Sequence, residues 1–536
     1  MKQERACITP MMRRGGLRAY RQEKGRVLAR YGYTLAGRIA TIESENGIHT
    51  HYTYDEEGNL KSLTIGKGEE WLLYAAHYTY DLRGNRLTKR GQRLGESESV
   101  RQGRLQPLAT TYTYDTMNRL IKEERPEGGE SYTYDLAGNR LSRSCYHYVL
   151  RQEGGEGKAE PEGAVVDFTE GYCYNEGNQL IKRENGRETT TYTYDEQGNL
   201  VKEVTVKAGG GQEEQRTLYH YDLLNRQKQV ELPGGGIQTS QYDGEGLRAG
   251  LSTGEGENYT FLYHQGELLR EEKAGDFSRS YIRGHGLVGL ETEERGYHSC
   301  HLDEQHSTIY VTGSRAEVEN AYGYDAFGNL LAKRERFYNR IRYTGQQHEQ
   351  EAKQYYLRAR YYHPALGRFM QEDSYRGDGL NLYAYCGNNP VRYFDPSGHE
   401  KICPKGESNS AGTDTQAKKV NESGSSSGKY QVGAYQDIKG VEGLDAHHVG
   451  QKALMKKLVA DYDELTAPAI NVPKLGHTKR NPERGIVSRN TKGITNARQL
   501  LARDLFELKR VYPDIPNSAL KELIDMNKKM YPEMRK

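Results

Sequence analysis

Histidines gather near the C-terminal end of the chain, beside an aspartate and an asparagine. The residues are Asp445, His447, His448, Asn471 and His477. Imidazole accepts a proton near neutral pH, and in its neutral form it binds divalent metals. The order His-His, Asn, His therefore predicts a divided site, in which one His activates water, another group binds a metal and the Asn fixes orientation.

The two adjacent histidines constrain the strand that carries them. Side chains alternate between the two faces of a strand, so His447 and His448 serve one site only where the strand bends or ends. Taken alone, a His-His pair is more often a structural or incidental feature. The sequence around His447 and His448 must therefore decide whether the pair is functional.

The region around these residues is basic and has helical patterns. Residues 430–536 contain 19 Lys and Arg against 13 Asp and Glu, a net charge of +6, which favours a nucleic-acid partner. Apolar spacing predicts helices at 451–459, 496–512 and 518–530, hence a small α+β domain. The candidates to hold phosphates are Arg480, Arg484, Arg489 and Arg498, for which a solvated basic face is the alternative.

This pattern resembles the HNH/endonuclease VII superfamily of nuclease toxins, which has the ββα-metal fold. Ala446-His447-His448 spells the signature of its AHH branch, and the resemblance covers residues 444–509. It implies that His448 is the general base at the end of the first strand. It also implies that His447 and His477 lie on the metal side.

Two further roles follow from the same resemblance. Asn471 matches the central Asn, which orients the base or binds the metal. No second downstream His completes an H-x-x-x-H pair, so the ligand set is one side chain short. We expect Asp445 or water to supply the missing ligand.

The resemblance implies phosphodiester hydrolysis. His448 would remove a proton from water, while one Mg²⁺ or Zn²⁺ would neutralise the phosphate and the leaving oxygen. No aromatic platform for single strands is evident, so duplex DNA is favoured. RNA stays open, because phosphate contacts do not report the sugar.

An internal repeat dominates the rest of the chain. Its unit, Tyr-x-Tyr-Asp-x-x-Gly-Asn-(Arg/Leu)-Leu, begins at Tyr52, Tyr78, Tyr112, Tyr132, Tyr172, Tyr192, Tyr219 and Tyr322. Tyr-x-Tyr puts two rings on one face of a strand, and Asp-x-x-Gly-Asn supplies the side-chain bonds and the positive φ of a tight turn. Each unit is predicted to be a β-hairpin. Because a lone hairpin is unstable, stacked hairpins should form one long sheet.

These are YD repeats, and residues 31–399 resemble an RHS-type protein. Residues 360–399 match the RHS-associated core signature almost throughout. The resemblance implies a spiral β-sheet that curls into a shell around a C-terminal cargo, with the core as a plug. Family shells usually have more repeats, so an incomplete shell is expected. The predicted fold class is mostly β, followed by a small α+β domain of the ββα-metal type.

The core also suggests an autoprocessing site. RHS proteins that release their cargo use a carboxylate pair, and the matching residues here are Asp373 and Asp395. Two carboxylates in one site split their pKa values, which lets one act as base and the other as acid. His399 stands where the family usually has Leu. The alternative is that both aspartates only close turns.

Composition divides the chain into four parts. We expect a YD-repeat region at 1–330, the core at 331–399, a Ser/Gly/Lys-rich flexible linker at 400–429 and the toxin domain at 430–536. Residues 1–399 have a net charge of −5, so body and tail should have different roles. No run of roughly 20 apolar residues and no secretory h-region is visible. We therefore expect no membrane insertion, and delivery by a route without a signal peptide.

Two classes of function remain open. In the first, the chain is an RHS-type toxin, made in the cytoplasm and then secreted or delivered into a competing cell. Its partners would be nucleic acid, secretion-system components and a cognate immunity protein, which would complement the charge of +6 if acidic. In the second, it is a non-enzymatic YD-repeat surface, carbohydrate-binding or adhesion protein with an inert tail.

Overall fold

The computed structural model of the chain describes residues 9–13, 16–21, 26–68, 71–95, 105–150, 161–209, 214–375, 381–403, 429–441, 443–448, 452–459, 462–481, 485–487, 494–512, 515 and 517–534. Most of the predicted linker lies outside these residues. No helix among them is long and apolar enough to cross a membrane.

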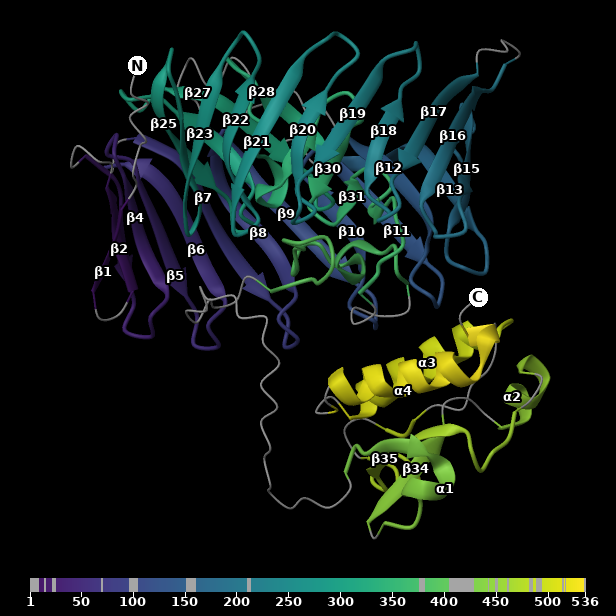
Figure 1. The fold of residues 1–536 in the computed structure, drawn as a ribbon. Coiled ribbons are helices and arrows are strands. Elements are labelled where there is room, and N and C mark those ends of the chain that lie inside the picture. Colours follow the sequence, from purple (N-terminus) through teal and green to yellow (C-terminus); the bar gives the residue numbers. More distant parts are fainter. Residues whose placement is uncertain are drawn as a thin grey trace.

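The repeats build one antiparallel sheet, to which the described residues contribute 28 strands (Figure 1). Successive strands pair with each other in chain order, as predicted for stacked hairpins. The first half comprises β1 (Thr9–Arg13), β2 (Gly16–Arg21), β3 (Val27–Tyr33), β4 (Ile39–Ser44), β5 (His49–Tyr54), β6 (Leu60–Lys67), β7 (Trp71–Tyr80), β8 (Arg86–Leu94), β9 (Leu105–Tyr114), β10 (Leu120–Arg125), β11 (Gly128–Tyr134), β12 (Arg140–Leu150), β13 (Pro161–Tyr174) and β14 (Leu180–Glu184). The second half comprises β15 (Glu188–Tyr194), β16 (Leu200–Lys207), β17 (Gln215–Tyr221), β18 (Gln227–Glu231), β19 (Ile237–Tyr242), β20 (Arg248–Ser252), β21 (Asn258–His264), β22 (Glu267–Lys273), β23 (Ser278–Gly284), β24 (Gly286–Thr292), β25 (Gly296–Leu302), β26 (Thr308–Thr312), β27 (Val318–Tyr324) and β28 (Leu330–Arg334).

The tyrosine pair explains why the hairpins stack. The second Tyr of most units donates its hydroxyl to a backbone carbonyl of the preceding hairpin, as Tyr54 does to Ile39 at 2.9 Å and Tyr134 to Leu120 at 2.8 Å. The same bond recurs at Tyr80, Tyr114, Tyr174, Tyr221, Tyr242 and Tyr324. Each repeat thus satisfies a buried hydroxyl on its neighbour, so the hairpins stabilise one another.

The turn residues act as their types predict. In the β5–β6 turn, Asp55 Oδ1 accepts from the backbone N–H of Asn59 at 2.6 Å, and the Asn59 side chain donates to Asp55 Oδ2 at 2.9 Å. Gly58 takes a φ of +80° there. Where the repeat has no Gly, as at Asn118, the Asn takes the positive φ of 62° instead.

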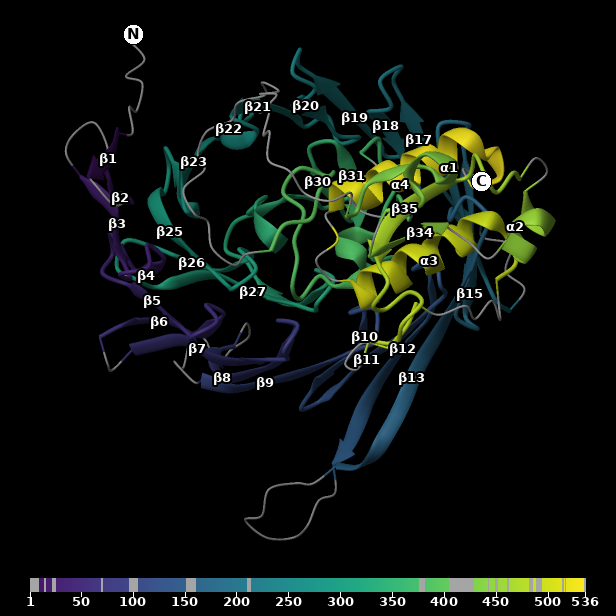
Figure 2. The same ribbon diagram turned by 90° about the horizontal axis from the view of Figure 1, so that it is seen from below.

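The sheet curls until its late strands meet its early ones (Figure 2). Tyr310 on β26 donates to the Leu73 carbonyl of β7 at 3.2 Å, and Asn46 donates to Thr312 Oγ1 at 2.8 Å. Contacts between residues more than 200 positions apart therefore close the curve.

The core fills the inside of this curve. Its strands are β29 (Gln347–Glu349), β30 (Gln354–Leu357), β31 (Arg360–His363) and β32 (Arg368–Phe369). Tyr356 and Tyr361 pack in one buried cluster with tyrosines of the large sheet, including Tyr192. The plug predicted from the resemblance is therefore present, and it lies within the curled sheet (Figure 2).

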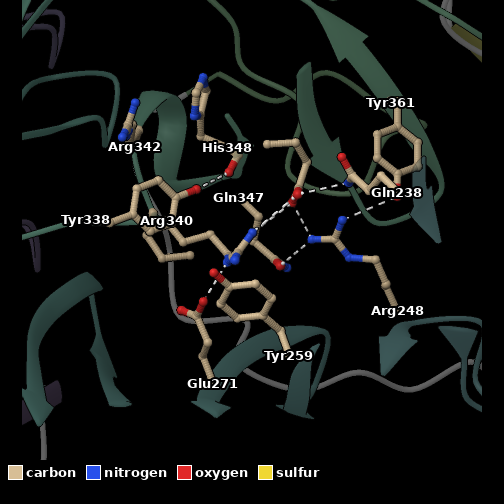
Figure 3. Close-up of polar contacts among 12 residues, drawn as sticks. Gln238, Arg248, Tyr259, Glu271, Tyr338, Arg340, Arg342, Gln347, His348 and Tyr361 are labelled. Atoms are coloured by element: carbon tan, nitrogen blue, oxygen red, sulfur yellow. Dashed lines mark hydrogen bonds and ion pairs between the residues drawn. The ribbon is translucent and has the colours of Figure 1, made fainter. Parts of the chain in front are cut away.

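Paired charges accompany the buried rings. Arg340 donates to Glu271 at 2.9 Å, and Arg248 donates to Gln347 at 3.2 Å. Figure 3 shows these side chains together, with Gln238 beside Arg248. Both arginines also pair with Glu349. Because an unpaired buried charge is costly, these ion pairs hold the core in one position against the sheet.

The C-terminal residues form a separate layered unit. It comprises β33 (Val432–Ala434), α1 (Tyr435–Ile438), β34 (Leu444–His448), α2 (Lys452–Leu458), β35 (Pro468–Pro473), α3 (Ala497–Val511) and α4 (Asn517–Met530), with the strand order β33-β35-β34. The three predicted helices are confirmed. The Asn496 side chain accepts from the backbone N–H of Gln499 at 2.9 Å, which caps α3. Ile470 and Val472 of β35 join the apolar cluster formed with α3 and α4.

This unit lies outside the curled sheet (Figure 1). The resemblance implied a cargo within the shell, and the structure differs from that expectation. Core side chains occupy part of the interior, where they pack against the tyrosines of the sheet.

Candidate functional site

The register of β34 and β35 separates the predicted residues into two sets. Asp445 pairs with Val472 and His447 with Ile470, while Ala446 pairs with Asn471. Directly opposed residues share a face, so Asp445 and His447 lie on the face that carries the apolar cluster. Asn471 and His448 lie on the other face, toward α1.

The first set is a chain of hydrogen bonds. Asp445 Oδ2 lies 3.0 Å from His477 Nδ1, and His477 Nε2 lies 2.9 Å from His447 Nδ1. Thr478 donates its hydroxyl to the same carboxylate oxygen at 2.8 Å. Partial burial opposes ionisation of Asp445, but the bonds from Thr478 and His477 outweigh it and lower the pKa of the carboxyl. Asp445 is thus a carboxylate that orients His477.

His448 is the last residue of β34, and aromatic side chains surround it. The Tyr435 ring meets it edge-on at 4.1 Å, and Tyr462 Oη lies 3.4 Å from its Nδ1. Burial lowers the pKa of His448, and this effect outweighs the nearby Glu464 carboxylate, which raises it; Lys452 and His477 add smaller contributions that lower it. Its Nε2 is buried and has no hydrogen-bond partner in the described part of the chain. The ring is therefore neutral near pH 7, with one nitrogen uncommitted.

Asn471 is buried, and its side chain bonds to the backbone of α1. It is 1% exposed, and its side chain donates to the carbonyl of Ile438 at 2.8 Å. Its backbone also bonds to Tyr430 and Gln431. The structure thus places Asn471 where it ties α1 to the sheet, and gives it no bond to His448.

The arrangement is compatible with a divalent cation. A metal-binding His usually donates its second nitrogen to a carboxylate, as His477 can to Asp445. Imidazole ligands suit Zn²⁺, whereas Mg²⁺ prefers oxygen. Among the described residues no three His, Cys, Asp or Glu side chains converge as a metal-binding group. Of the predicted ligands, His447 and His477 have ring nitrogens 2.9 Å apart, so these two could share an ion whose shell water or phosphate would complete.

The predicted phosphate-binding arginines have different settings. Arg480 is exposed, while Arg484 and Arg489 lie outside the described residues. Arg498 is 5% exposed, and its guanidinium faces the side chain of Asn178 in the β13–β14 turn, 3.0 Å away when the amide oxygen is turned toward it. Arg498 therefore meets the sheet, and Arg480 is the described arginine that is open to a phosphate.

Sequence reasoning missed the neighbours of His448. Tyr435, Tyr462 and Lys452 belong to no recognisable motif and come from three separate segments. No pattern in the sequence marks them, because they meet His448 only through packing.

The core brings the two predicted autoprocessing residues together. Arg360 Nη2 lies 2.7 Å from Asp373 and 3.8 Å from Asp395, both of which are buried. His399 Nδ1 lies 2.9 Å from Asp373 Oδ1. Asp395 also accepts backbone N–H bonds from the turn that it opens, as the alternative interpretation required. The structure thus contains both the carboxylate pair that self-cleavage needs and the turn that the alternative interpretation predicts.

Comparison with known proteins identifies the repeat. The RHS Repeat family model matches residues 33–70 and 174–212. The tRNA nuclease WapA of Bacillus subtilis (strain 168) is 31% identical over 390 residues, which cover 69% of this chain and 14% of the relative. The probable deoxyribonuclease RhsB of Dickeya dadantii (strain 3937) is 25% identical over 393 residues, covering 69% of this chain and 25% of the relative.

A solved structure shares the fold. The Photorhabdus luminescens Tc holotoxin pore is 19% identical, with a TM-score of 0.50, over 74% of this chain and 20% of that chain. This chain spans well under two thirds of each of these proteins, and the sequence similarity lies in the RHS region. The matched repeats and the curled sheet that they build make this chain an RHS-repeat protein.

Proposed function

We propose that this chain belongs to a toxin whose C-terminal unit hydrolyses phosphodiester bonds in nucleic acid. The observation that carries the proposal is a half-buried, neutral His448 at the end of the strand that also carries Asp445 and His447, two residues that form a hydrogen-bonded set with His477. Relatives that share the RHS region are named as nucleases of tRNA and DNA, which supports the reaction class.

His448 is the general base in this proposal. Its lowered pKa keeps the imidazole unprotonated at neutral pH, so Nε2 can take a proton from water. His448 is the last residue of β34. Because the strand ends there, the His448 side chain can approach the same phosphate as His447, although the two side chains leave opposite faces of the strand.

His447 and His477 form the metal side of the site. A bound divalent cation, Zn²⁺ or Mg²⁺, would neutralise charge on the phosphate and its leaving oxygen. Asp445 holds His477 through Nδ1, which directs Nε2 toward His447. Arg480 is the candidate for a flanking, sequence-blind phosphate contact.

Digestion of nucleic acid by the purified full chain tests this function. Plasmid DNA and total RNA are incubated with Mg²⁺, Zn²⁺ or EDTA, beside the variants His448→Ala and His220→Ala. His220 is a half-exposed shell histidine bonded to Glu231, so its loss should change nothing. We expect metal-dependent cutting, of duplex DNA first, that only His448→Ala loses by roughly 10²- to 10⁴-fold.

Each outcome names a function. If RNA alone is cut, the enzyme class stands and the substrate changes. If neither nucleic acid is cut with any metal, the chain is better explained as a non-enzymatic surface or adhesion protein. The partners that follow from the nuclease are a cognate immunity protein, which should be acidic, and the machinery that delivers the toxin into another cell.

A second activity is self-cleavage at the core. The observation that favours it is the approach of Asp373 and Asp395 to the same guanidinium, that of Arg360, in a buried site. Arg360 also donates to the carbonyl oxygen of Gly398, so the cluster holds a peptide bond beside two carboxylates. Release of a fragment beginning near residue 399, lost in Asp373→Asn, is the expected result on gels and by intact mass.

A further inference from the structure

His399 contacts the carboxylate that the proposed self-cleavage would use. Its Nδ1 lies 2.9 Å from Asp373 Oδ1, and the backbone N–H of Tyr375 donates to the same oxygen at 2.8 Å. Arg360 Nη2 lies 2.7 Å from the other oxygen, Oδ2. Both oxygens of Asp373 therefore already have partners within the protein.

The turn that carries His399 is held firmly against the pair. Asp395 Oδ1 accepts from the backbone N–H groups of Ser397, Gly398 and His399 at 3.0, 2.8 and 3.2 Å. Beyond the turn, Phe394 and Ile402 exchange two backbone bonds of 3.0 and 2.8 Å. These bonds restrain residues 394–402, so the imidazole of His399 remains hydrogen-bonded to Asp373.

Peptide hydrolysis requires a carboxylate oxygen that is free to contact water. One carboxylate must take a proton from water, whose oxygen then bonds to the carbonyl carbon. The C–N bond breaks when the second carboxyl group donates a proton to the leaving nitrogen, giving a new carboxylic acid and a new amine. Asp373 can accept the first proton only if one of its oxygens faces water instead of an N–H group.

We infer that His399 is a latch on the carboxylate pair, and that its hydrogen bond to Asp373 slows self-cleavage of this chain. The inference rests on the proposed self-cleavage. His399 is 39% exposed at its side chain, whereas Asp373 is 4% exposed. The imidazole therefore lies between the pair and solvent, where its removal admits water to Asp373.

The test uses the full chain and two substitutions at one position. His399→Leu removes the donor with little change in volume, while His399→Gln keeps an N–H group that reaches the carboxylate. Intact mass and gels follow release of the tail fragment over time. We expect His399→Leu to cut roughly 10- to 100-fold faster than the unchanged chain, and His399→Gln to stay slow.

Matched controls separate the latch from the reaction that it controls. His220→Leu removes another His bonded to a carboxylate, 2.8 Å from Glu231 and distant in sequence, and should leave the rate unchanged. Adding Asp373→Asn to His399→Leu should abolish cutting, and melting curves check that each variant folds.

The possible results distinguish the two proposals. Equal cutting by the unchanged chain and His399→Leu, lost in both on Asp373→Asn, overturns the latch and keeps self-cleavage. No cutting by the unchanged chain or by a folded His399→Leu overturns both, whereas cutting by the unchanged chain alone overturns only the latch. Cutting that survives Asp373→Asn also overturns both, since the pair then does not act. None of these results bears on the nuclease.

Discussion

His447 Nδ1 and His477 Nε2 lie 2.9 Å apart, although the two residues are 30 positions apart in the chain. The pairing of β34 with β35 and the loop after β35 bring them together. Two imidazole nitrogens at this distance share a proton in the absence of a metal, and a cation would displace that proton. Metal binding and protonation of this pair should therefore compete.

The pH dependence of cutting should report His448. A base acts only when it is deprotonated, so activity falls as pH drops through its pKa. Because burial lowers that pKa, the fall should lie below the ordinary value of 6.5. Initial rates of plasmid cutting between about pH 5 and 8 measure it. Tyr435→Ala exposes the His448 ring to water, which should raise the pKa of His448 and move the loss of activity to higher pH. A fall above pH 7 in the unchanged chain would contradict the assignment.

Asp445→Asn should weaken metal binding. The carboxylate orients His477 through Nδ1, and loss of such a partner typically costs 10- to 100-fold in metal affinity. Calorimetric titration of the full chain with Zn²⁺ gives the affinity independently of activity. Asp167→Asn is the matched control, because Asp167 bonds to His147 at 2.7 Å in the shell. Equal affinities in all three proteins would show that Asp445 does not support the site.

Asn471→Ala should act on stability more than on chemistry. Its buried amide bonds to the Ile438 carbonyl, so truncation leaves that carbonyl unpaired at a cost of about 1–3 kcal/mol. Denaturant unfolding of the C-terminal unit within the full chain measures the change. His448→Ala should leave the same transition almost unmoved. If Asn471→Ala unfolds normally but abolishes cutting, Asn471 has the orienting role that the sequence resemblance implied.

The repeat tyrosines should differ in what their hydroxyls contribute. Tyr134→Phe removes the bond to the Leu120 carbonyl and should destabilise the sheet by about 1 kcal/mol. Tyr192→Phe should be neutral or stabilising, since that hydroxyl is buried without a hydrogen-bond partner in the described part of the chain. Melting curves of the two variants, recorded side by side, make the comparison. Equal shifts would mean that the stacking bond contributes nothing.

The sequence by itself determined the repeat architecture. Alternation in Tyr-x-Tyr and the bonding needs of Asp55, Gly58 and Asn59 are local, so they specify a hairpin wherever they occur. The helices of the tail were predictable for the same reason, because apolar spacing and the Asn496 cap act within one element.

Only the tertiary structure decided how the functional side chains meet. Strand pairing placed Asp445 behind His477 and put Asn471 against Ile438, away from His448. Curling of the sheet around the core brought Asp373 to Arg360 and to His399. These contacts join residues that are far apart in sequence, and they depend on register, curvature and burial, which no single segment encodes.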